Sequence, residues 1–290
     1  MWADVGGVDW AALKHNYGSA EDVPGLLERC AGPRADDADA AADELLNLLF
    51  HQGGWICSAV PAALPFLIRL ATMPAVPSRR AVLDLLAMLA SEATEVRERF
   101  LDPAWQPAWA RALPDVLALL DDPEPRIRRS AAEIVGVCES SGELTLPALL
   151  RRLRAEDDPA ARLELVLALG QAVRREPAGD RASEVVFLLG ELVEAPEAQV
   201  RLAAVHALTP GAPDLPAERL DLLLEAVRDP SVGVWRRTSS LEARPEGVQQ
   251  WTAGLLPGPD PSFALGLLAW HPDEEQRIGA LGQAGRSLCR

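Results

Sequence analysis

The feature that most constrains the fold is a sequence motif that recurs along the chain. Four segments begin with Leu or Val and continue with apolar residues at helical spacing. They are residues 113–120, 146–150, 185–189 and 220–224. A single pair of amphipathic helices cannot bury its apolar face, whereas stacked pairs bury a continuous core. The motif therefore predicts an array of helix pairs.

A second helix is expected after each of these segments, and its early residues include an apolar residue followed by arginine. These arginines are Arg128, Arg162 and Arg201, at intervals of 34 and 39 residues, and residues 234–236 continue the series with Trp235 in the arginine position. Asp-Pro pairs precede the expected helices, since Asp can cap exposed amides and Pro suits a first helical turn. The pairs begin at Asp122, Asp158, Asp229 and Asp260.

The leucine-rich first helix, the Asp-Pro turn and the Val/Ile-Arg-x-x-Ala second helix resemble the HEAT repeat family. The resemblance implies an all-α fold without a sheet, namely an α-solenoid (superhelix) of about seven irregular helix pairs. We expect one such solenoid over residues 1–290. It would comprise an N-terminal cap in 1–35, irregular repeats in 36–112, the clearest repeats in 113–241, and C-terminal repeats and a cap in 242–290. It implies no particular activity, because function belongs to sites rather than folds.

The arginines of the second helices have a structural and a functional interpretation. In HEAT repeats, this arginine pairs with an acidic turn residue of a neighbouring repeat. The resemblance gives Asp122, Asp158 and Asp229 that role toward arginines such as Arg128 and Arg162. The alternative is a ridge of arginines that grips phosphate groups. The net charge of −15 favours the structural interpretation.

Composition indicates a helical protein whose net negative charge disfavours binding to polyanions. Apolar residues make up 49% of the chain and aromatic residues only 5%, which favours helix over strand. Lys and Arg number 28 against 43 Asp and Glu, so neither nucleic acid nor a membrane is expected as a partner. No apolar run approaches the roughly 20 residues of a membrane span, and the first residues lack a signal-peptide pattern. With four scattered cysteines, these features predict a cytoplasmic protein with buried, reduced thiols.

The sequence lacks the motifs of several enzyme classes. Lys14 is its single lysine, so a GxxxxGK[ST] loop is excluded, and no GxSxG, HExxH or GxGxxG occurs. None of the four histidines is followed by Glu, so the likeness to HEAT-repeat hydroxylases, whose metal site rests on His-Glu pairs, is missing. We therefore expect no cofactor and no metal.

Two N-terminal stretches concentrate residue types that recognise ligands. The first contains His15 and Tyr17, the only tyrosine of the chain. The second contains His51, Gln52 and Trp55 around a Gly-Gly turn. Because the later repeats consist mostly of Leu, Ala, Arg and acidic residues, we predict that any specific binding site consists of these five residues.

A terminal cap is the alternative interpretation of the same stretches. Spacing predicts that Trp10, Leu13 and Tyr17 share one face of a helix that ends at Gly18, and this face would cover the first repeat. A cap gives no reason for His51 to approach these residues. The relative positions of the imidazoles therefore decide between the two interpretations.

Three classes of function remain open from the sequence. The first is a non-enzymatic binding protein with a concave surface for a basic protein partner: a scaffold, a regulator or a toxin-neutralising immunity-type protein. The second is a small-molecule lyase or tailoring enzyme with a pocket in the N-terminal repeats. The third is a HEAT-like DNA glycosylase, in which Trp105 and Trp109 would hold damaged duplex beside Asp102 and Asp115. Of the three, protein binding is favoured, because no catalytic set is complete.

Overall fold

The computed structural model describes residues 4–138, 142–208, 229, 231 and 234. The chain divides into two compact units, Met1–Ala148 and Leu149–Arg290, and each is described by itself. Within the described residues there are ten α-helices and one two-stranded hairpin. The prediction of an all-α fold is therefore confirmed in its class, whereas the expectation of no sheet is wrong.

The elements of the first unit follow one another in short steps. It begins with two 3-10 turns (Val5–Gly7 and Trp10–Ala12) and the hairpin of β1 (Lys14–His15) and β2 (Gly18–Ser19). The helices are α1 (Val23–Cys30), α2 (Ala35–Leu49), α3 (Ala59–Thr72), α4 (Arg79–Glu95), α5 (Trp105–Ala118) and α6 (Pro125–Val137). Two more 3-10 turns lie at Glu98–Phe100 and Leu119–Asp121. Helix α7 (Gly142–Ala155) crosses the boundary between the units.

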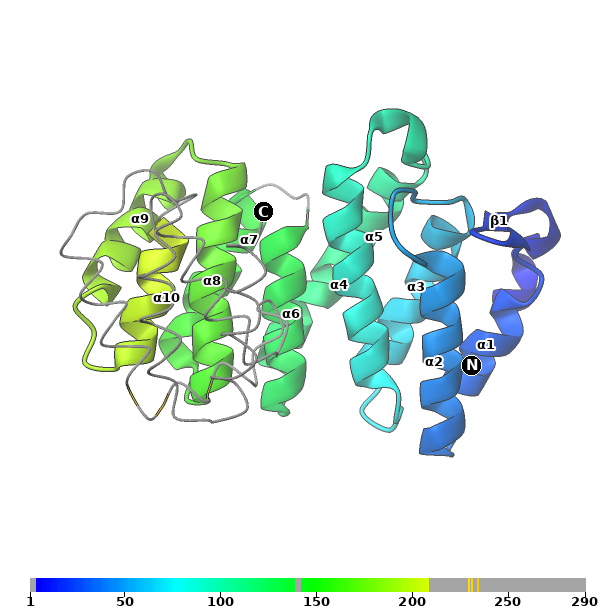
Figure 1. Cartoon of the computed structure of the whole chain (residues 1–290), viewed down its shortest axis with the longest axis horizontal. Coiled ribbons are helices and arrows are strands. Elements are labelled where there is room, and N and C mark those ends of the chain that lie inside the picture. The colour runs from blue at the N-terminus through cyan, green and yellow to red at the C-terminus, as the bar shows by residue number, and fades with distance from the viewer. Residues whose placement is uncertain (1–3, 139–141, 209–228, 230, 232–233, 235–290) are drawn as a thin grey trace, which may run out of the picture. The chain divides into compact units, whose positions relative to one another are not determined.

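The helices of the first unit pack in sequence and in two rows. Helix α1 packs on α2, α3 on α4, and α5 on α6. The odd-numbered helices also contact one another from α1 to α3 to α5, and the even-numbered helices from α2 to α4 to α6 (Figure 1). The core between the rows contains the fully buried side chains of Leu27, Leu45, Leu67, Leu83, Trp105 and Trp109.

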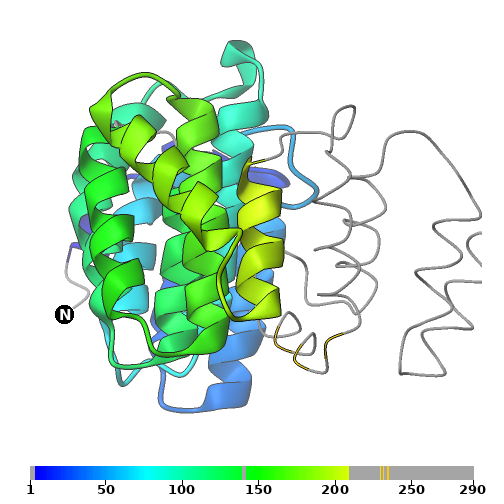
Figure 2. The same ribbon diagram turned by 90° about the vertical axis from the view of Figure 1, so that its left-hand side faces the viewer.

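The second unit contains α8 (Pro159–Arg175), α9 (Asp180–Leu192) and α10 (Ala198–Leu208). Helix α9 packs on both others, and α8 and α10 lie side by side (Figures 1 and 2). Gly170 makes the close approach of α8 to α10 possible, because a Cβ there would lie 2.5 Å from the Cβ of Ala207. Half-buried His206 of α10 has its pKa lowered to about 3 by burial and by the nearby Arg174.

The region 1–35, predicted as a cap, contains a full helix as well as the hairpin. Helix α1 packs against α2 as the first helix of a pair. The predicted helix through Trp10, Leu13 and Tyr17 is wrong, because the chain makes a 3-10 turn and then a hairpin. Hydrogen bonds outside a helical pattern stabilise the hairpin: the backbone N–H of Asn16 donates to the carbonyl oxygen of Leu48 over 2.9 Å.

The predicted boundary at 112/113 lies inside α5, which begins at Trp105. Pro107 lies in the first turn of this helix, where a proline costs no intrahelical hydrogen bond. The helix can therefore begin eight residues before residue 113, where the sequence pattern placed its start, because Pro107 does not interrupt it.

Two of the Asp-Pro turns illustrate different uses of the aspartate. Asp158 is the N-cap of α8 and accepts hydrogen bonds from the backbone N–H groups of Ala160 and Ala161, which confirms the predicted capping role. Asp122 instead lies before the N-cap of α6 and forms a buried ion pair with Arg79 of α4. The acidic turn residue therefore does pair with an arginine of another helix pair, although that arginine was not among those predicted.

Two of the three second-helix arginines, Arg128 and Arg201, bind backbone carbonyl groups. In α6, Arg128 donates through Nη1 to the carbonyl oxygens of Asp122 (2.9 Å) and Pro123 (3.1 Å). In α10, Arg201 donates through Nη1 to the carbonyl oxygens of Ala195 (2.7 Å) and Pro196 (2.9 Å). Arg128 and Arg201 therefore stabilise the turn that precedes their own helix by hydrogen bonding to its carbonyl oxygens. The Nε of Arg162 is buried without a hydrogen-bond partner among the described residues.

Several predicted features fall outside the described residues. They are the segment 220–224, Trp235, the Asp260 turn, the C-terminal repeats and cap in 242–290, and Cys289. Cys30, Cys57 and Cys138 are buried, as predicted, and none of the three forms a disulfide within the described part of the chain. Burial raises the pKa of the Cys30 thiol to about 11. Among the helices that the structure describes, none is both long and apolar enough to cross a bilayer.

Candidate functional site

The N-terminal hairpin carries Tyr17 at its tip and is fastened to the end of α2. Both the backbone N–H and the side-chain amide of Asn16 donate to the carbonyl oxygen of Leu48, each over 2.9 Å. The N–H of Lys14 donates to Oγ of Ser58, 3.0 Å away. Gly18 follows with φ of +146°, which favours glycine. These bonds present Tyr17 on the surface, with 62% of its area exposed.

The loop after α2 carries His51 in a backbone conformation that residues other than glycine rarely adopt. Its φ is +56°, in the left-handed region, and its N–H donates to the carbonyl oxygen of Leu46 over 2.9 Å. Gly53 and Gly54 follow with φ of +78° and +89°. A left-handed residue after a helix is a common C-terminal cap, but glycine or asparagine usually occupies it. His51 therefore carries backbone strain of about 1–3 kcal/mol that the surrounding loop must offset.

Glu92 of α4 holds this loop in place. Its carboxylate accepts a hydrogen bond from the N–H of Gly54. A Cβ on Gly53 would meet the same carboxylate, which would have to move aside, and the positive φ of residue 53 also favours glycine there. Further along, the N–H of Ile56 donates to the carbonyl oxygen of Phe100 over 2.8 Å, which fixes the far end of the loop.

The hairpin and the loop meet at a hydrogen bond between two exposed side chains. The hydroxyl of Tyr17 lies 2.6 Å from Nδ1 of His51, and the ring centroids are 5.1 Å apart at an interplanar angle of 80°. The two residues are 34 positions apart in the sequence. The structure thus brings together two of the five predicted site residues, in an edge-to-face arrangement that is favourable for aromatic rings.

His15 lies beside this pair but has a different environment. It is 5% exposed, and its Nδ1 accepts a hydrogen bond from the N–H of Tyr17 over 3.0 Å. This bond assigns the remaining proton to Nε2, which lies 3.2 Å from Oδ1 of Asp22. The distance between Nε2 and Oδ1 is that of an ion pair. The two atoms are not aligned as a hydrogen bond, and Nε2 has no hydrogen-bond partner among the described residues. His15 therefore orients the hairpin and is poorly placed to bind a ligand.

Gln52 and Trp55 lie on the same loop as His51, with Gln52 exposed and Trp55 half-buried. Their position places them next to the Tyr17–His51 pair in the chain, and their role in binding stays a prediction. Sequence reasoning missed Asn16, Asp22 and Glu92, which position the site. Asn16 could have been identified from its tendency to form turns, whereas Glu92 carries no local signal.

The aromatic residues assigned to a glycosylase are in the core. Trp105 and Trp109 are 1% and 2% exposed, and they stack on each other with ring centroids 5.3 Å apart. Neither ring can stack on a nucleobase in this conformation. Asp102 accepts a hydrogen bond from the N–H of Ala104 at the start of α5, which is a structural role. The two aromatic rings that the glycosylase interpretation assigned to base stacking are therefore buried in this structure.

Among the described residues, no group of three or more His, Cys, Asp or Glu side chains converges to hold a metal ion. A comparison with known protein families and with characterised proteins finds no significant match to this chain.

Proposed function

We propose that the chain is a HEAT-type solenoid that binds a protein partner without catalysis, as a scaffold, regulator or toxin-neutralising protein. Its recognition surface would comprise Tyr17, His51, Gln52 and Trp55, and its net charge of −15 favours a basic partner. The observation that carries the proposal is the hydrogen bond between Tyr17 and His51, two exposed side chains that separate parts of the chain hold together.

The repeat assignment has support from packing and from a recurring hydrogen-bond pattern. In the first unit, alternate helices contact each other in two rows, as the helices of a solenoid do. Arg128 and Arg201 bind carbonyl oxygens six and five residues before them, in different units of the chain. Two equivalent local structures at equivalent motif positions are expected of repeats and not of unrelated helices.

The exposure of Tyr17 favours protein binding over catalysis. A catalytic pair works best in a cavity that excludes water, whereas 62% of the Tyr17 surface is open to solvent. Tyrosine is enriched among the residues that dominate protein interfaces. The hairpin and the Glu92-held loop fix both side chains before binding, which lowers the entropy that association costs. Strain at His51 is also typical of sites that function maintains.

The test compares affinity capture from the native cell lysate by wild type, Tyr17→Ala and His51→Ala. A partner should be enriched on wild type and lost on both variants, and Phe187→Ala should retain it as a control, because Phe187 is an exposed aromatic residue of α9 in the second unit. With the purified partner, Tyr17→Ala should weaken binding by about 2 kcal/mol if Tyr17 is a central contact.

His15→Ala is not suitable for testing binding, because replacing the buried His15 side chain would disturb the hairpin itself. Thermal melting of Tyr17→Ala and His51→Ala should stay close to wild type, so that lost capture reports on recognition. If the same proteins are captured with equal efficiency by all variants, this surface is not the recognition site.

A second candidate is a small-molecule lyase or tailoring enzyme, and the 2.6 Å contact between the Tyr17 hydroxyl and Nδ1 of His51 favours it. A histidine at this distance could accept the hydroxyl proton as a general base. Tyr17→Phe separates the candidates, because it abolishes proton transfer but keeps most of the contact surface. If Tyr17→Phe binds the protein partner as wild type does, the result supports protein recognition. If it binds a small-molecule substrate but no longer converts it, the result supports the enzyme.

A further inference from the structure

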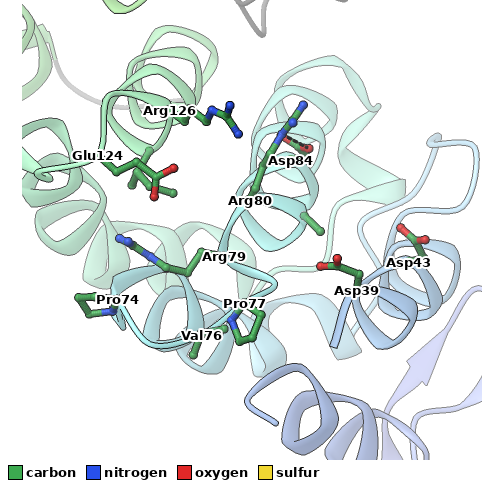
Figure 3. Close-up of a pocket in the computed structure, with 12 residues that line it drawn as sticks. Asp39, Asp43, Pro74, Val76, Pro77, Arg79, Arg80, Asp84, Glu124 and Arg126 are labelled. Atoms are coloured by element: carbon green, nitrogen blue, oxygen red, sulfur yellow. Dashed lines mark ion pairs between the residues drawn. The ribbon is translucent and has the colours of Figure 1, made fainter. Parts of the chain in front are cut away.

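A groove of about 460 Å³ lies beside Asp39 and Asp43 of α2, where the first turns of α4 and α6 meet the loop before α4 (Figure 3). Its volume is within the range of ligand-binding pockets. Asp39 and Asp43 lie about 15 and 9 Å before Leu49, the last residue of α2, along the helix axis, since a helix rises about 1.5 Å per residue. None of the residues that line the groove belongs to the hairpin or to the loop after α2. The groove and the Tyr17–His51 surface are therefore distinct sites on the same unit.

The α2 side of the groove carries two carboxylates without a cation. Asp39 and Asp43 are exposed and lie one helical turn apart, where like charges repel. Arg29 pairs with their helix neighbours Asp37 and Glu44 instead. Among the residues that the structure describes, none forms an ion pair with Asp39 or Asp43. A cation from outside would therefore relieve this repulsion.

The part of the groove formed by α4 and α6 carries two exposed guanidinium groups. Arg126 of α6 is exposed and has no hydrogen bond or ion pair within the described residues. The side chain of Arg80 on α4 is 67% exposed, and its Nε lies 3.8 Å from Oδ2 of Asp84. At this distance and exposure the ion pair is weak. Figure 3 shows both arginine side chains on neighbouring helices of the same side. Two adjacent guanidinium groups suit a carboxylate.

The base of the groove is fixed and already neutralised. Arg79 forms the buried ion pair with Asp122, and its Nε donates to the carbonyl oxygen of Ala71 over 2.8 Å. Apart from this pair and the Arg80–Asp84 pair, the groove has three carboxylates, those of Asp39, Asp43 and Glu124, and one guanidinium group, that of Arg126, without an ion pair among the described residues. The open surface is therefore negative overall, with a positive patch on one side.

This charge pattern excludes a simple ion as the occupant. The described carboxylates do not converge as metal ligands do, and an isolated anion would meet more negative than positive charge. An extended chain with separated charges fits both sides at once. Burial raises the pKa of Asp84, although 40% of its side chain remains exposed.

We propose that this groove binds a peptide segment of the protein partner that has at least two basic side chains and one acidic side chain. The basic side chains lie against Asp39 and Asp43, and the acidic side chain lies against Arg80 and Arg126. The inference rests on the proposed function, since it gives the partner a second contact beside Asp39 and Asp43 of α2. It also explains how an acidic protein selects one basic partner, because the positive patch rejects segments that are only basic.

The test uses the full chain and a fluorescent hexapeptide, blocked at both ends, that contains two lysines and one glutamate. Fluorescence anisotropy should give an affinity that falls with salt concentration. The variant D39N/D43N should bind about three- to tenfold more weakly, as expected for the loss of two exposed ion pairs. R126Q should remove the preference for this peptide over one with glutamine in place of glutamate.

Matched controls carry the same changes in charge outside the groove. They are D36N/E28Q for the carboxylates and R111Q for the arginine, all at exposed positions. Equal weakening by D39N/D43N and its control would overturn the proposal, as would complete competition by free lysine at equal concentration, which would indicate a small cation.

Retained glutamate preference in R126Q would equally contradict the assignment of the acidic side chain. Melting curves of the variants verify the fold, and the salt dependence of wild type needs no variant. Tyr17→Ala should bind the hexapeptide as wild type does. Loss of lysate capture in Tyr17→Ala with no groove effect in D39N/D43N would therefore reject the groove and leave the proposed function standing.

Discussion

The buried pair of Asp122 and Arg79 should be the most sensitive ion pair of the first unit. Each side chain is only 8% exposed. Asp122 also accepts a hydrogen bond from the N–H of Glu124 over 2.9 Å, and its carbonyl oxygen accepts one from Arg128. One residue therefore joins α4 to α6, through its side chain on one side and its backbone on the other. Asp122→Asn removes the charge but retains the oxygen that faces Glu124.

The expected cost of Asp122→Asn follows from the charge that it leaves behind. Removing one partner of a buried ion pair costs about 3–5 kcal/mol, because the other charge stays buried without compensation. Arg79 keeps its hydrogen bond to the carbonyl oxygen of Ala71, so the lower end of this range is expected. A loss of about 3 kcal/mol corresponds to about 6–12 °C in melting temperature for a domain of this size.

Urea denaturation followed by circular dichroism at 222 nm measures this cost, and thermal melting gives a second estimate. The matched control is Asp115→Asn, because Asp115 is an exposed residue of α5. A change in unfolding free energy below about 0.5 kcal/mol in Asp122→Asn, equal to the control, would refute the argument. In the double variant with Arg79→Met, the combined cost should be smaller than the sum of the single costs.

Three further predictions concern the two units separately. Arg128→Ala and Arg201→Ala should each lose about 1–2 kcal/mol in urea titrations, since each removes two charged hydrogen bonds to a turn; unequal costs would argue against equivalent roles. Gly170→Ala should cost about 1–3 kcal/mol, because the new methyl group meets Ala207, and an unchanged denaturation midpoint would contradict the close packing. The folded pKa of His206 lies below its unfolded value of 6.5, so only the unfolded chain binds a proton as the pH falls from 6.5 toward 3. Stability should fall across that range more steeply in wild type than in His206→Gln.

The helix content and the sequential packing could be predicted because they depend on local patterns. Leucines at helical spacing and Asp-Pro turns act within about one helix pair, so residues such as Asp158 behave as the sequence suggested. The pairing of Asp122 with Arg79 depends on two residues 43 positions apart. Several aspartates and arginines satisfy the same local pattern, and only packing selects which of them meet.

The N-terminal site shows how a prediction can identify residues while misplacing their backbone. The spacing of Trp10 and Tyr17 favoured a helix, but the hydrogen bonds of Asn16 to the end of α2 favour a hairpin. These bonds join segments far apart in sequence, and no periodicity in the sequence reports them. Glu92 acts in the same way, because its position on α4 becomes relevant only when the Gly-Gly turn packs against it.

This hairpin also separates two histidines that composition alone treats as equivalent. The bond from the Tyr17 amide occupies Nδ1 of His15 and turns its ring into the protein, so that histidine fixes the hairpin. His51 keeps its ring on the surface because its left-handed backbone directs the side chain toward Tyr17. A helix through residue 17 would not produce this difference. The hairpin, which the sequence pattern did not predict, is therefore what buries one histidine and leaves the other exposed at the surface.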